Sequence, residues 1–326
     1  MPHLSVFEEV FALRKAFRIS RGEKSAAQVL RVKLKDGDFI GQGECVPYAR
    51  YGESLDSVKE QIVSLTADLK QGADNQDLLK LLPAGAARNA VDCALWDLKS
   101  KKADIRIWEL LALQPKGLVE TCFTIGLDTP QNMRKEAEEN SFRTLLKLKL
   151  AGPEDLERVQ QVREGAPESR IIVDANEGWA LDEFIEILPS LEALGVVAIE
   201  QPLPAGQDAC LKEIDSSIPI IADESCHDTA SYERIADWYS FINIKLDKTG
   251  GLTEAMALKQ RALADGKQIM IGCMVGTSLA MAPALLLAQD ASIVDLDGPL
   301  LLAEDRAHAL AVKGNHLALP DRELWG

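Results

Sequence analysis

The sequence is poor in basic side chains, and this deficit narrows the kinds of partner that the protein can bind. Lys and Arg together number 36 against 51 Asp and Glu, which leaves a net charge of −15 over 326 residues. Nucleic-acid phosphates and anionic membrane surfaces are bound by clusters of positive side chains, and the sequence contains no stripe of Lys and Arg. We therefore expect neither a nucleic acid nor a membrane as a partner.

Paired cysteines and long apolar runs are also lacking. The six cysteines are scattered and no two of them form a CxxC motif, which favours reduced thiols over a disulfide framework or a zinc site. Apolar stretches such as residues 279–288 are too short to cross a bilayer. The N-terminal residues show no basic segment followed by an apolar core, as a signal peptide would. The sequence thus predicts a cytoplasmic protein.

Residues 1–117 have the patterns of a small α+β unit. Apolar residues alternate over 28–35, and an Asp-Gly turn follows them directly, which predicts an antiparallel hairpin. Apolar residues then recur at helical spacing in 55–69 and in 90–98. We expect two amphipathic helices packed on a small sheet, forming a capping domain.

From residue 118 onward, strand-like and helical segments alternate at a near-constant spacing. Eight apolar runs end at or near positions 124, 149, 174, 200, 223, 245, 272 and 295, so that successive positions are 22 to 27 residues apart. One strand and one helix per step is the pattern of parallel βα units, and eight such units close into a barrel. We predict a (β/α)₈-type barrel over residues 118–310, with a C-terminal segment at 311–326 that returns to the capping domain.

Three consecutive strands of this barrel are expected to end in acids, at the mouth where barrel enzymes place their active sites. The carboxylates of Asp174, Glu200 and Asp223 would repel one another there unless a cation neutralises them. Oxygen ligands without His or Cys favour a hard ion, Mg²⁺ or Mn²⁺. The three acids therefore predict a divalent metal site, with separate ion pairs to basic residues as the alternative.

Lysines flank these acids on both sides. Lys147 and Lys149 are two positions apart, so both side chains of the expected strand point into the barrel. Lys245 ends a strand on the opposite side. Inward-facing lysines are costly for a purely structural purpose, which favours Lys149 and Lys245 as an acid–base pair and Lys147 as a source of positive charge. Nearby cations and partial burial should lower the pKa of both acid–base lysines toward the operating pH.

This set of residues suits removal of a proton from the carbon beside a carboxylate. The resulting enediolate carries charge that a metal can stabilise as a Lewis acid. A base on one face and an acid on the other allow the proton to leave from one side and return to the other. The residues therefore predict a racemisation or an epimerisation.

Five motifs, in order and spacing, resemble the enolase superfamily in its muconate-lactonising subgroup. They are KLK at 147–149, VDAN at 173–176, EQP at 200–202, ADES at 222–225 and INIKLDKTGG at 242–251. Members of that family place an α+β capping domain over a modified TIM barrel and pair a lysine base with bound Mg²⁺. The resemblance implies that Asp174, Glu200 and Asp223 bind the metal and that Lys149 and Lys245 transfer the proton.

Within the subgroup, the sequence is most similar to dipeptide epimerases of the L-Ala-D/L-Glu type. Their Asp-x-Asp motif is matched by Asp295 and Asp297, and the stretches 47–54 and 85–99 resemble theirs as well. The resemblance implies that both acids receive the free ammonium of a dipeptide. It also implies a substrate such as L-Ala-L/D-Glu and a setting in murein peptide turnover.

Two further substrate contacts are implied by the resemblance. The loop at 17–22 offers Arg21, or Arg18 as a second choice, to pair with a glutamate side chain, and Thr124 matches a position near the substrate carboxylate. Other reactions of the superfamily remain as alternatives, namely those of N-acylamino acid racemases, o-succinylbenzoate synthases and muconate cycloisomerases. A catalytically silent metal-binding barrel is a further alternative, and homo-oligomerisation is left open.

Overall fold

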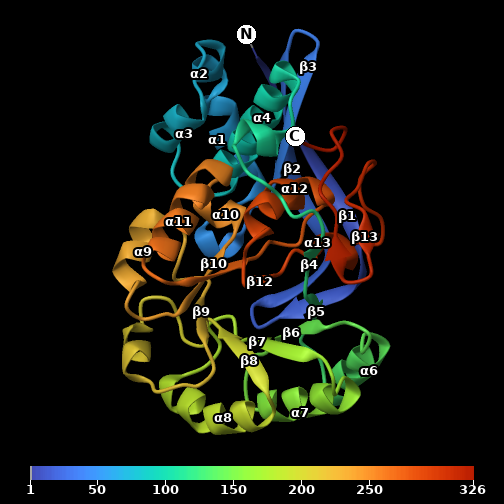
Figure 1. Ribbon diagram of the computed structural model, residues 1–326, viewed down its shortest axis with the longest axis vertical. Coiled ribbons are helices and arrows are strands. Elements are labelled where there is room, and N and C mark those ends of the chain that lie inside the picture. Colours follow the sequence, from blue (N-terminus) through green and yellow to red (C-terminus); the bar gives the residue numbers. More distant parts are fainter. Residues whose placement is uncertain (1) are drawn as a thin grey trace.

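The computed structural model of the protein describes residues 2–326, and two parts of the molecule can be distinguished in it (Figure 1). A three-stranded sheet with helices packed against it lies at one end, and an eight-stranded sheet with helices around it lies at the other. None of the helices within the described residues combines the length and the apolar character that a membrane span needs.

The N-terminal sheet is antiparallel and consists of β1 (His3–Ile19), β2 (Gly22–Asp36) and β3 (Phe39–Cys45). The hairpin of β2 and β3 confirms the expectation from the alternating pattern. The long strand β1 was not expected, because it is a mostly exposed edge strand whose many charged residues leave no clear alternation. Its register with β2 shifts between Ala12 and Phe17.

Helices α1 (Leu55–Ser64), α2 (Thr66–Lys70) and α4 (Ala86–Ala103) pack on this sheet, and α3 (Asn75–Leu81) packs on α4. The expected helix over 55–69 is therefore two helices, and α3, which begins at a capping box on Asp74, was not expected at all. Helix α4 crosses β3 so closely that a Cβ added at Gly41 would lie 2.2 Å from the Ala94 carbonyl oxygen. A larger residue at Gly41 would push this helix off the sheet.

The eight-stranded sheet is parallel and follows the strand order β12-β11-β10-β9-β8-β7-β6-β5. Its two edges meet, because the Cys122 N–H donates to the Val294 carbonyl at 2.9 Å. The predicted barrel is thereby confirmed. Its strands are β5 (Phe123–Ile125), β6 (Leu145–Lys149), β7 (Arg170–Asp174), β8 (Val196–Glu200), β9 (Ile220–Ala222), β10 (Phe241–Ile244), β11 (Gln268–Ile271) and β12 (Ile293–Val294).

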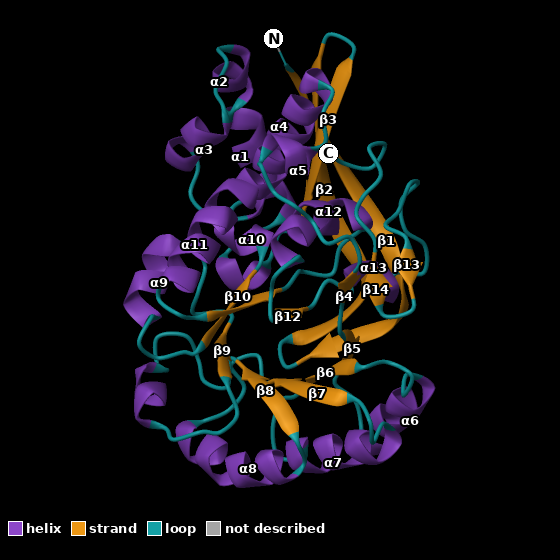
Figure 2. Cartoon of the chain, viewed as in Figure 1, coloured by secondary structure: helices purple, strands orange, loops and turns teal. Residues whose placement is uncertain are grey.

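Helices lie outside these strands, and Figure 2 shows α7 and α8 along the outer side of β7 and β8. One step departs from the regular pattern, because a 3₁₀ turn, Ala209–Glu213, replaces the helix between β8 and β9. The barrel helices are α6 (Pro130–Glu139), α7 (Asp155–Gly165), α8 (Leu181–Ala193), α9 (Thr229–Ile235), α10 (Leu246–Thr249), α11 (Leu252–Ala264), α12 (Ser278–Ala288) and α13 (Gly298–Leu301).

Inside the barrel, an apolar layer lies beneath a polar one. Six strands each contribute one buried apolar side chain to a shared cluster. Because side chains alternate along a strand, the residue two positions later also faces the interior. The apolar layer comprises Leu145, Ile172, Ala198, Ile221, Phe241 and Met270. Two positions beyond the first four stand Lys147, Asp174, Glu200 and Asp223. Ordinary strand periodicity thus sets the charged groups directly on an apolar floor.

The last residues of the chain lie against the N-terminal unit. The Trp325 indole N–H donates to the Cys93 carbonyl at 3.0 Å, and the Gly326 N–H donates to Asp97 Oδ1 at 2.7 Å. Short strands β13 (Val312–Lys313) and β14 (His316–Leu317) pair in turn with β4 (Val119–Glu120). The division of the chain at residues 117 and 310 stays a prediction.

Candidate active site

A cavity of about 460 Å³ lies between the mouth of the barrel and the N-terminal unit. Its wall includes six barrel residues that the sequence singled out, and Arg21 from the β1–β2 turn. Three others, Lys147, Asp174 and Glu200, are buried beside it, with at most 1% of each exposed. The six barrel residues in the wall are Thr124, Lys149, Asp223, Lys245, Asp295 and Asp297.

Each of the three acids predicted to bind a metal lies at or just beyond the end of its strand. Asp174 and Glu200 are neighbours in the register of β7 and β8. Burial would raise the pKa of Asp174, but the charges of Lys149 and Lys147 outweigh it and hold the pKa at about 2. Burial and the negative charge of Asp174 raise the pKa of Glu200 to about 7.

These acids fit a hard divalent ion by their donor chemistry. All three offer carboxylate oxygens; Glu200 Oε1 accepts from Asn243 Nδ2 at 2.8 Å, and Lys147 Nζ lies 2.6 Å from Glu200 Oε2. Among the described residues, a second group of possible metal ligands lies close together. The ligand atoms of Cys122, Asp295 and Asp297 are within 4.8 Å of one another. Buried lysines pair with acids of both sets, but Cys122 offers a soft thiol where the three strand-end acids offer oxygen alone, so the strand-end acids suit a hard ion better.

Lys147 is the lysine that neutralises Asp295, and it lies at the centre of the buried charges. Its Nζ is 2.6 Å from Glu200 Oε2, 2.7 Å from Asp295 Oδ2 and 3.2 Å from Asp174 Oδ2. A buried ammonium with three carboxylate partners keeps its proton. Lys147 therefore supplies fixed positive charge, as its position in the sequence suggested.

Lys149 and Lys245 approach the cavity from the ends of β6 and β10, which have three strands between them in the sheet. Lys149 Nζ lies 2.6 Å from Asp174 Oδ2, and Lys245 Nζ lies 2.6 Å from Asp223 Oδ2. The expectation of a lowered pKa is wrong for Lys245. Burial acts in that direction, but the charges of Asp223 and Glu200 outweigh it and raise the pKa above its usual value.

Asp295 and Asp297 stand on the wall beside β5, as the period of two predicts. Asp297 begins α13 and accepts the backbone N–H of Thr124 on Oδ2 at 2.6 Å. Burial and the neighbouring Asp295 raise the pKa of Asp297 to about 6. Asp295 is paired with Lys147, so Asp297 is the carboxylate of the two with room for a further cation.

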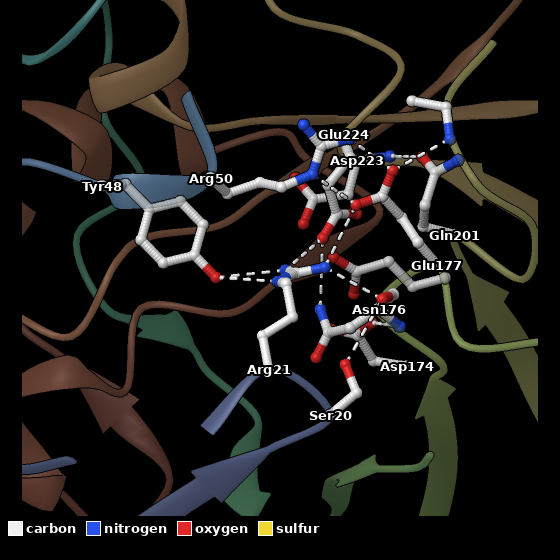
Figure 3. A network of polar contacts seen from close by, with 12 residues as sticks. Ser20, Arg21, Tyr48, Arg50, Asp174, Asn176, Glu177, Gln201, Asp223 and Glu224 are labelled. Carbon is white, nitrogen blue, oxygen red and sulfur yellow. Dashed lines mark hydrogen bonds and ion pairs between the residues drawn. The ribbon is translucent and has the colours of Figure 1, made fainter. Parts of the chain in front are cut away.

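Arg21 reaches the cavity from the tip of the β1–β2 hairpin, as Figure 3 shows. The neighbouring Gly22 has a φ of 136°, which an L residue with a side chain rarely adopts. Arg21 Nη2 lies 2.6 Å from Glu224 Oε1. Arg18 instead pairs with Glu23 on the exposed face of the hairpin at 2.6 Å. The structure therefore places Arg21, and not Arg18, in the wall of this cavity.

Two family descriptions together match most of the chain. Residues 1–112 match the mandelate racemase / muconate lactonizing enzyme N-terminal domain. Residues 131–323 match the enolase C-terminal domain-like family. The chain belongs to the enolase superfamily.

Relatives of this superfamily member act on amino acid derivatives. It is 43% identical to the L-Ala-D/L-Glu epimerase of Escherichia coli K12, over 98% of this chain and 100% of that protein. It is 44% identical to an N-acetyl-D-glutamate racemase of a Pseudoalteromonas species, over 90% of this chain and 94% of that protein. The protein is thus an isomerase of the racemase and epimerase kind that acts on amino acid derivatives.

Solved structures of the superfamily agree with this fold. An Agrobacterium tumefaciens member with homology to dipeptide epimerases superposes with a TM-score of 0.98 at 47% identity and full coverage of both chains. That structure holds sodium and L-Ala-L-Glu, with an ordered loop. The dipeptide epimerase of Cytophaga hutchinsonii, complexed with Mg and D-Ala-L-Val, superposes with a TM-score of 0.90 at 25% identity, over 97% of this chain and 92% of that one.

The site of this enolase-superfamily member contains residues that the sequence reading missed. Lys248 is buried and donates to Asp223 Oδ1 at 2.6 Å and to the Asn243 carbonyl at 2.9 Å. It lies in the INIKLDKTGG motif, three positions after Lys245, so its motif carried the signal.

The cavity rim is a second group that was not anticipated. Arg50 and Glu177 form a two-pronged ion pair there, with both N–O distances at 2.8 Å, and Glu224 accepts from Arg21. Glu224 belongs to the ADES motif, directly after a proposed metal ligand. The pairing itself joins loops more than 100 residues apart, and no local pattern reveals it.

Proposed function

We propose that the protein is a Mg²⁺-dependent dipeptide epimerase that inverts the α-carbon beside the C-terminal carboxylate, with L-Ala-L/D-Glu as its substrate type. One observation carries the proposal most directly: Lys149 and Lys245 enter one cavity from separate sides of the barrel, with acids for an ammonium on the wall beside β5. An α-carbon held between the two Nζ atoms has a base on one face and an acid on the other. A cytoplasmic location is part of the same proposal.

Asp174, Glu200 and Asp223 would hold the divalent ion at the mouth of the barrel. When bound, the ion supplies positive charge beside the substrate carboxylate, which favours loss of the neighbouring proton. Lys147 adds a second, permanent positive charge on the same side, because three carboxylates keep it protonated. Lys248 and Asn243 hold Asp223 and Glu200 in place through the hydrogen bonds described above.

Proton transfer falls to the two cavity lysines. The Nζ of one lysine takes the proton from the α-carbon, and the Nζ of the other returns a proton to the opposite face. A lysine can act as the base only after its own proton is gone, and in the structure Asp223 keeps Lys245 protonated. A divalent ion held by Asp223 would offset the negative charge that this carboxylate presents to Lys245. Lys245 would then lose its proton more easily.

Asp297 would receive the ammonium of the dipeptide, because Lys147 is already paired with Asp295, whereas Asp297 accepts only the uncharged backbone N–H of Thr124 among the hydrogen bonds described above. Arg21, at the other side of the cavity, would face the side chain of the C-terminal residue. An acidic side chain would form a charge-assisted ion pair with the Arg21 guanidinium. This arrangement accounts for a dipeptide with a free amine at one end and an acidic residue at the other.

An N-acylglutamate is a second candidate substrate, because the Pseudoalteromonas relative is an N-acetyl-D-glutamate racemase at 44% identity. Both substrates carry the glutamate that Arg21 would bind, and they differ in the charge at the amine. A hydrogen bond to a charged group is worth about 1.5–3 kcal/mol, so the dipeptide should be preferred roughly 10- to 100-fold in kcat/KM.

The deciding assay follows α-proton exchange in D₂O by NMR, with L-Ala-L-Glu and N-acetyl-L-Glu compared at equal concentration. Polarimetry then checks that the opposite epimer forms. A kcat/KM for N-acetyl-L-Glu above that for the dipeptide would move the assignment to the racemase. Exchange with neither compound, in protein loaded with Mg²⁺, would contradict both candidates.

A further inference from the structure

The guanidinium of Arg21 is the cation that an acidic substrate side chain would meet, yet two carboxylates of the protein already surround it (Figure 3). Its Nη2 lies 2.6 Å from Glu224 Oε1, and its Nη1 lies 3.2 Å from Glu177 Oε2. Tyr48 Oη and the backbone carbonyl of Asn176 complete the contacts at 3.1 and 2.9 Å. An arriving anion therefore has to share the guanidinium with charges that belong to the protein.

The two carboxylates depend on Arg21 to different degrees. Glu177 is held by Arg50 through both of its oxygens and by the backbone N–H of Ala205 at 2.9 Å. Glu224 has only 1% of its side chain exposed, and within residues 2–326 Arg21 is the cation at ion-pair distance from it. Arg21 therefore neutralises Glu224, whereas Glu177 has a cation of its own.

The hydrogen bonds of Glu224 lead to the same conclusion. Its Oε1 accepts from Arg21 and, at 3.4 Å, from Asn176 Nδ2, while its Oε2 is buried without a hydrogen-bond donor. A buried carboxylate with so few partners holds its cation firmly. The positive charge of Arg21 and the negative charge of Glu224 cancel each other when no acidic ligand is present.

We propose that Glu224 is an internal competitor for Arg21 and that it sets the selectivity of the cavity between acidic and neutral C-terminal residues of a dipeptide. The inference rests on the proposed function, because Arg21 must face the substrate side chain. With a neutral side chain in place, Arg21 stays on Glu224 and both charges remain paired. With an acidic side chain, two anions meet one guanidinium in buried surroundings and repel each other.

The first test is Glu224→Gln, which removes the charge but keeps the size and an oxygen that accepts from Arg21. The measured quantity is the ratio of kcat/KM for L-Ala-L-Glu to that for L-Ala-L-Gln, two dipeptides that differ in one charge. We expect this ratio to rise about tenfold over the wild-type ratio, mainly through a lower KM for L-Ala-L-Glu. Glu177→Gln is the matched control, and its ratio should change less than about twofold because Arg50 holds Glu177.

A second variant, Arg21→Met, tests the contact from the other side and does not depend on the folding of the first. Losing the guanidinium leaves the carboxylate of Glu224 facing the cavity without a cation. The preference should then invert, with kcat/KM for L-Ala-L-Lys exceeding that for L-Ala-L-Glu by about tenfold. Adding Glu224→Gln to Arg21→Met should remove that preference again.

The outcomes are distinct. An unchanged or lower Glu-to-Gln ratio in Glu224→Gln overturns the inference, and so does an Arg21→Met variant that gains nothing on L-Ala-L-Lys. Equal losses on both dipeptides in Glu224→Gln, together with weaker Mg²⁺ binding by calorimetry, would assign Glu224 to the support of Asp223 and also overturn it. A wild-type protein that epimerises neither L-Ala-L-Glu nor L-Ala-L-Gln contradicts the proposed function instead.

Discussion

The charged side chains on the barrel strands and those on the cavity rim meet in one space, but they are held in different ways. The strand residues Lys147, Asp174 and Glu200 stand on an apolar floor, and each takes its direction from the backbone of its strand. The rim residues Arg21 and Glu224 come from loops and hold each other across the cavity by an ion pair. Strand geometry is rigid, whereas a loop ion pair can be exchanged for another partner.

This difference suggests that the reaction and the choice of substrate can be altered separately. Changes on the strands should act on turnover with every dipeptide. Changes on the rim should act on the preference between dipeptides. The experiments below test this separation, beginning with the largest expected effect.

Lys149→Ala and Lys245→Ala should each lower epimerisation about 10²- to 10⁴-fold, the contribution of one positioned general acid or base. Either variant should still exchange the α-proton of one epimer through the lysine that remains. NMR in D₂O separates exchange from inversion. Lys212→Ala, a change at an exposed lysine, is the control. Full epimerisation by either lysine variant would break the two-base scheme.

Removal of divalent metal with a chelator should silence both proton exchange and epimerisation, and Mg²⁺ should restore them. The physical reason is that the ion held by Asp174, Glu200 and Asp223 would supply the positive charge that favours loss of the substrate α-proton. Calorimetric titration of the stripped protein with Mg²⁺ gives a readout besides activity. Asp223→Asn should weaken that binding, and turnover that persists in excess chelator would exclude a catalytic metal.

Asp297→Asn should lower kcat/KM for L-Ala-L-Glu roughly 10- to 100-fold, the value of about 1.5–3 kcal/mol for a hydrogen bond to a charged group. Turnover of N-acetyl-L-Glu, which has no ammonium, should change much less. This comparison separates recognition of the ammonium at the wall beside β5 from recognition of the acidic side chain at the Arg21 rim. Equal losses on both compounds would mean that Asp297 supports the fold of α13 and not the ammonium.

The smallest expected effect concerns stability at the contact between the N-terminal unit and the barrel. Asp247 accepts hydrogen bonds from Asn89 Nδ2 at 2.8 Å and from the Val46 N–H at 3.1 Å. Burial raises its pKa to about 7, so the folded protein binds the proton more tightly than the unfolded chain does. Stability from this group is present at low pH and is lost as pH rises toward 7, at up to about 1.4 kcal/mol per pH unit.

Chemical denaturation between pH 4 and pH 8 measures this dependence. Asp247→Asn keeps an acceptor oxygen without the charge, so its unfolding free energy should fall less steeply with pH than that of the wild type. The difference between the two curves isolates this carboxyl from the other titrating groups. Parallel curves would show that Asp247 does not titrate in this range.

The barrel and its charged strand ends could be predicted from the sequence because both follow local rules. Strand periodicity alone places Lys147 and Lys149 on one face, and regular spacing locates the eight strand ends. The edge strand β1 escaped prediction because an exposed strand needs no apolar alternation. The pairing of Arg21 with Glu224 also escaped, since it depends on how two distant loops meet.

The direction of the Lys245 pKa shows a different limit of sequence reasoning. Its burial was foreseen, and burial alone lowers the pKa of a lysine. The sequence did not reveal that Asp223 Oδ2 would lie 2.6 Å from its Nζ. A pKa depends on distances of a few ångströms, and a motif does not contain them.

The apolar layer that fills the barrel below the charged groups has a consequence for isotope experiments. Leu145, Ile172 and Phe241 of this layer are buried, so water has no route to the lysines from below. Once a ligand fills the mouth, the ammonium that has captured a label is cut off from bulk solvent. Exchange of the label into solvent then reports how often product dissociates. Return of the label to the α-carbon reports how often the reaction reverses before product dissociates.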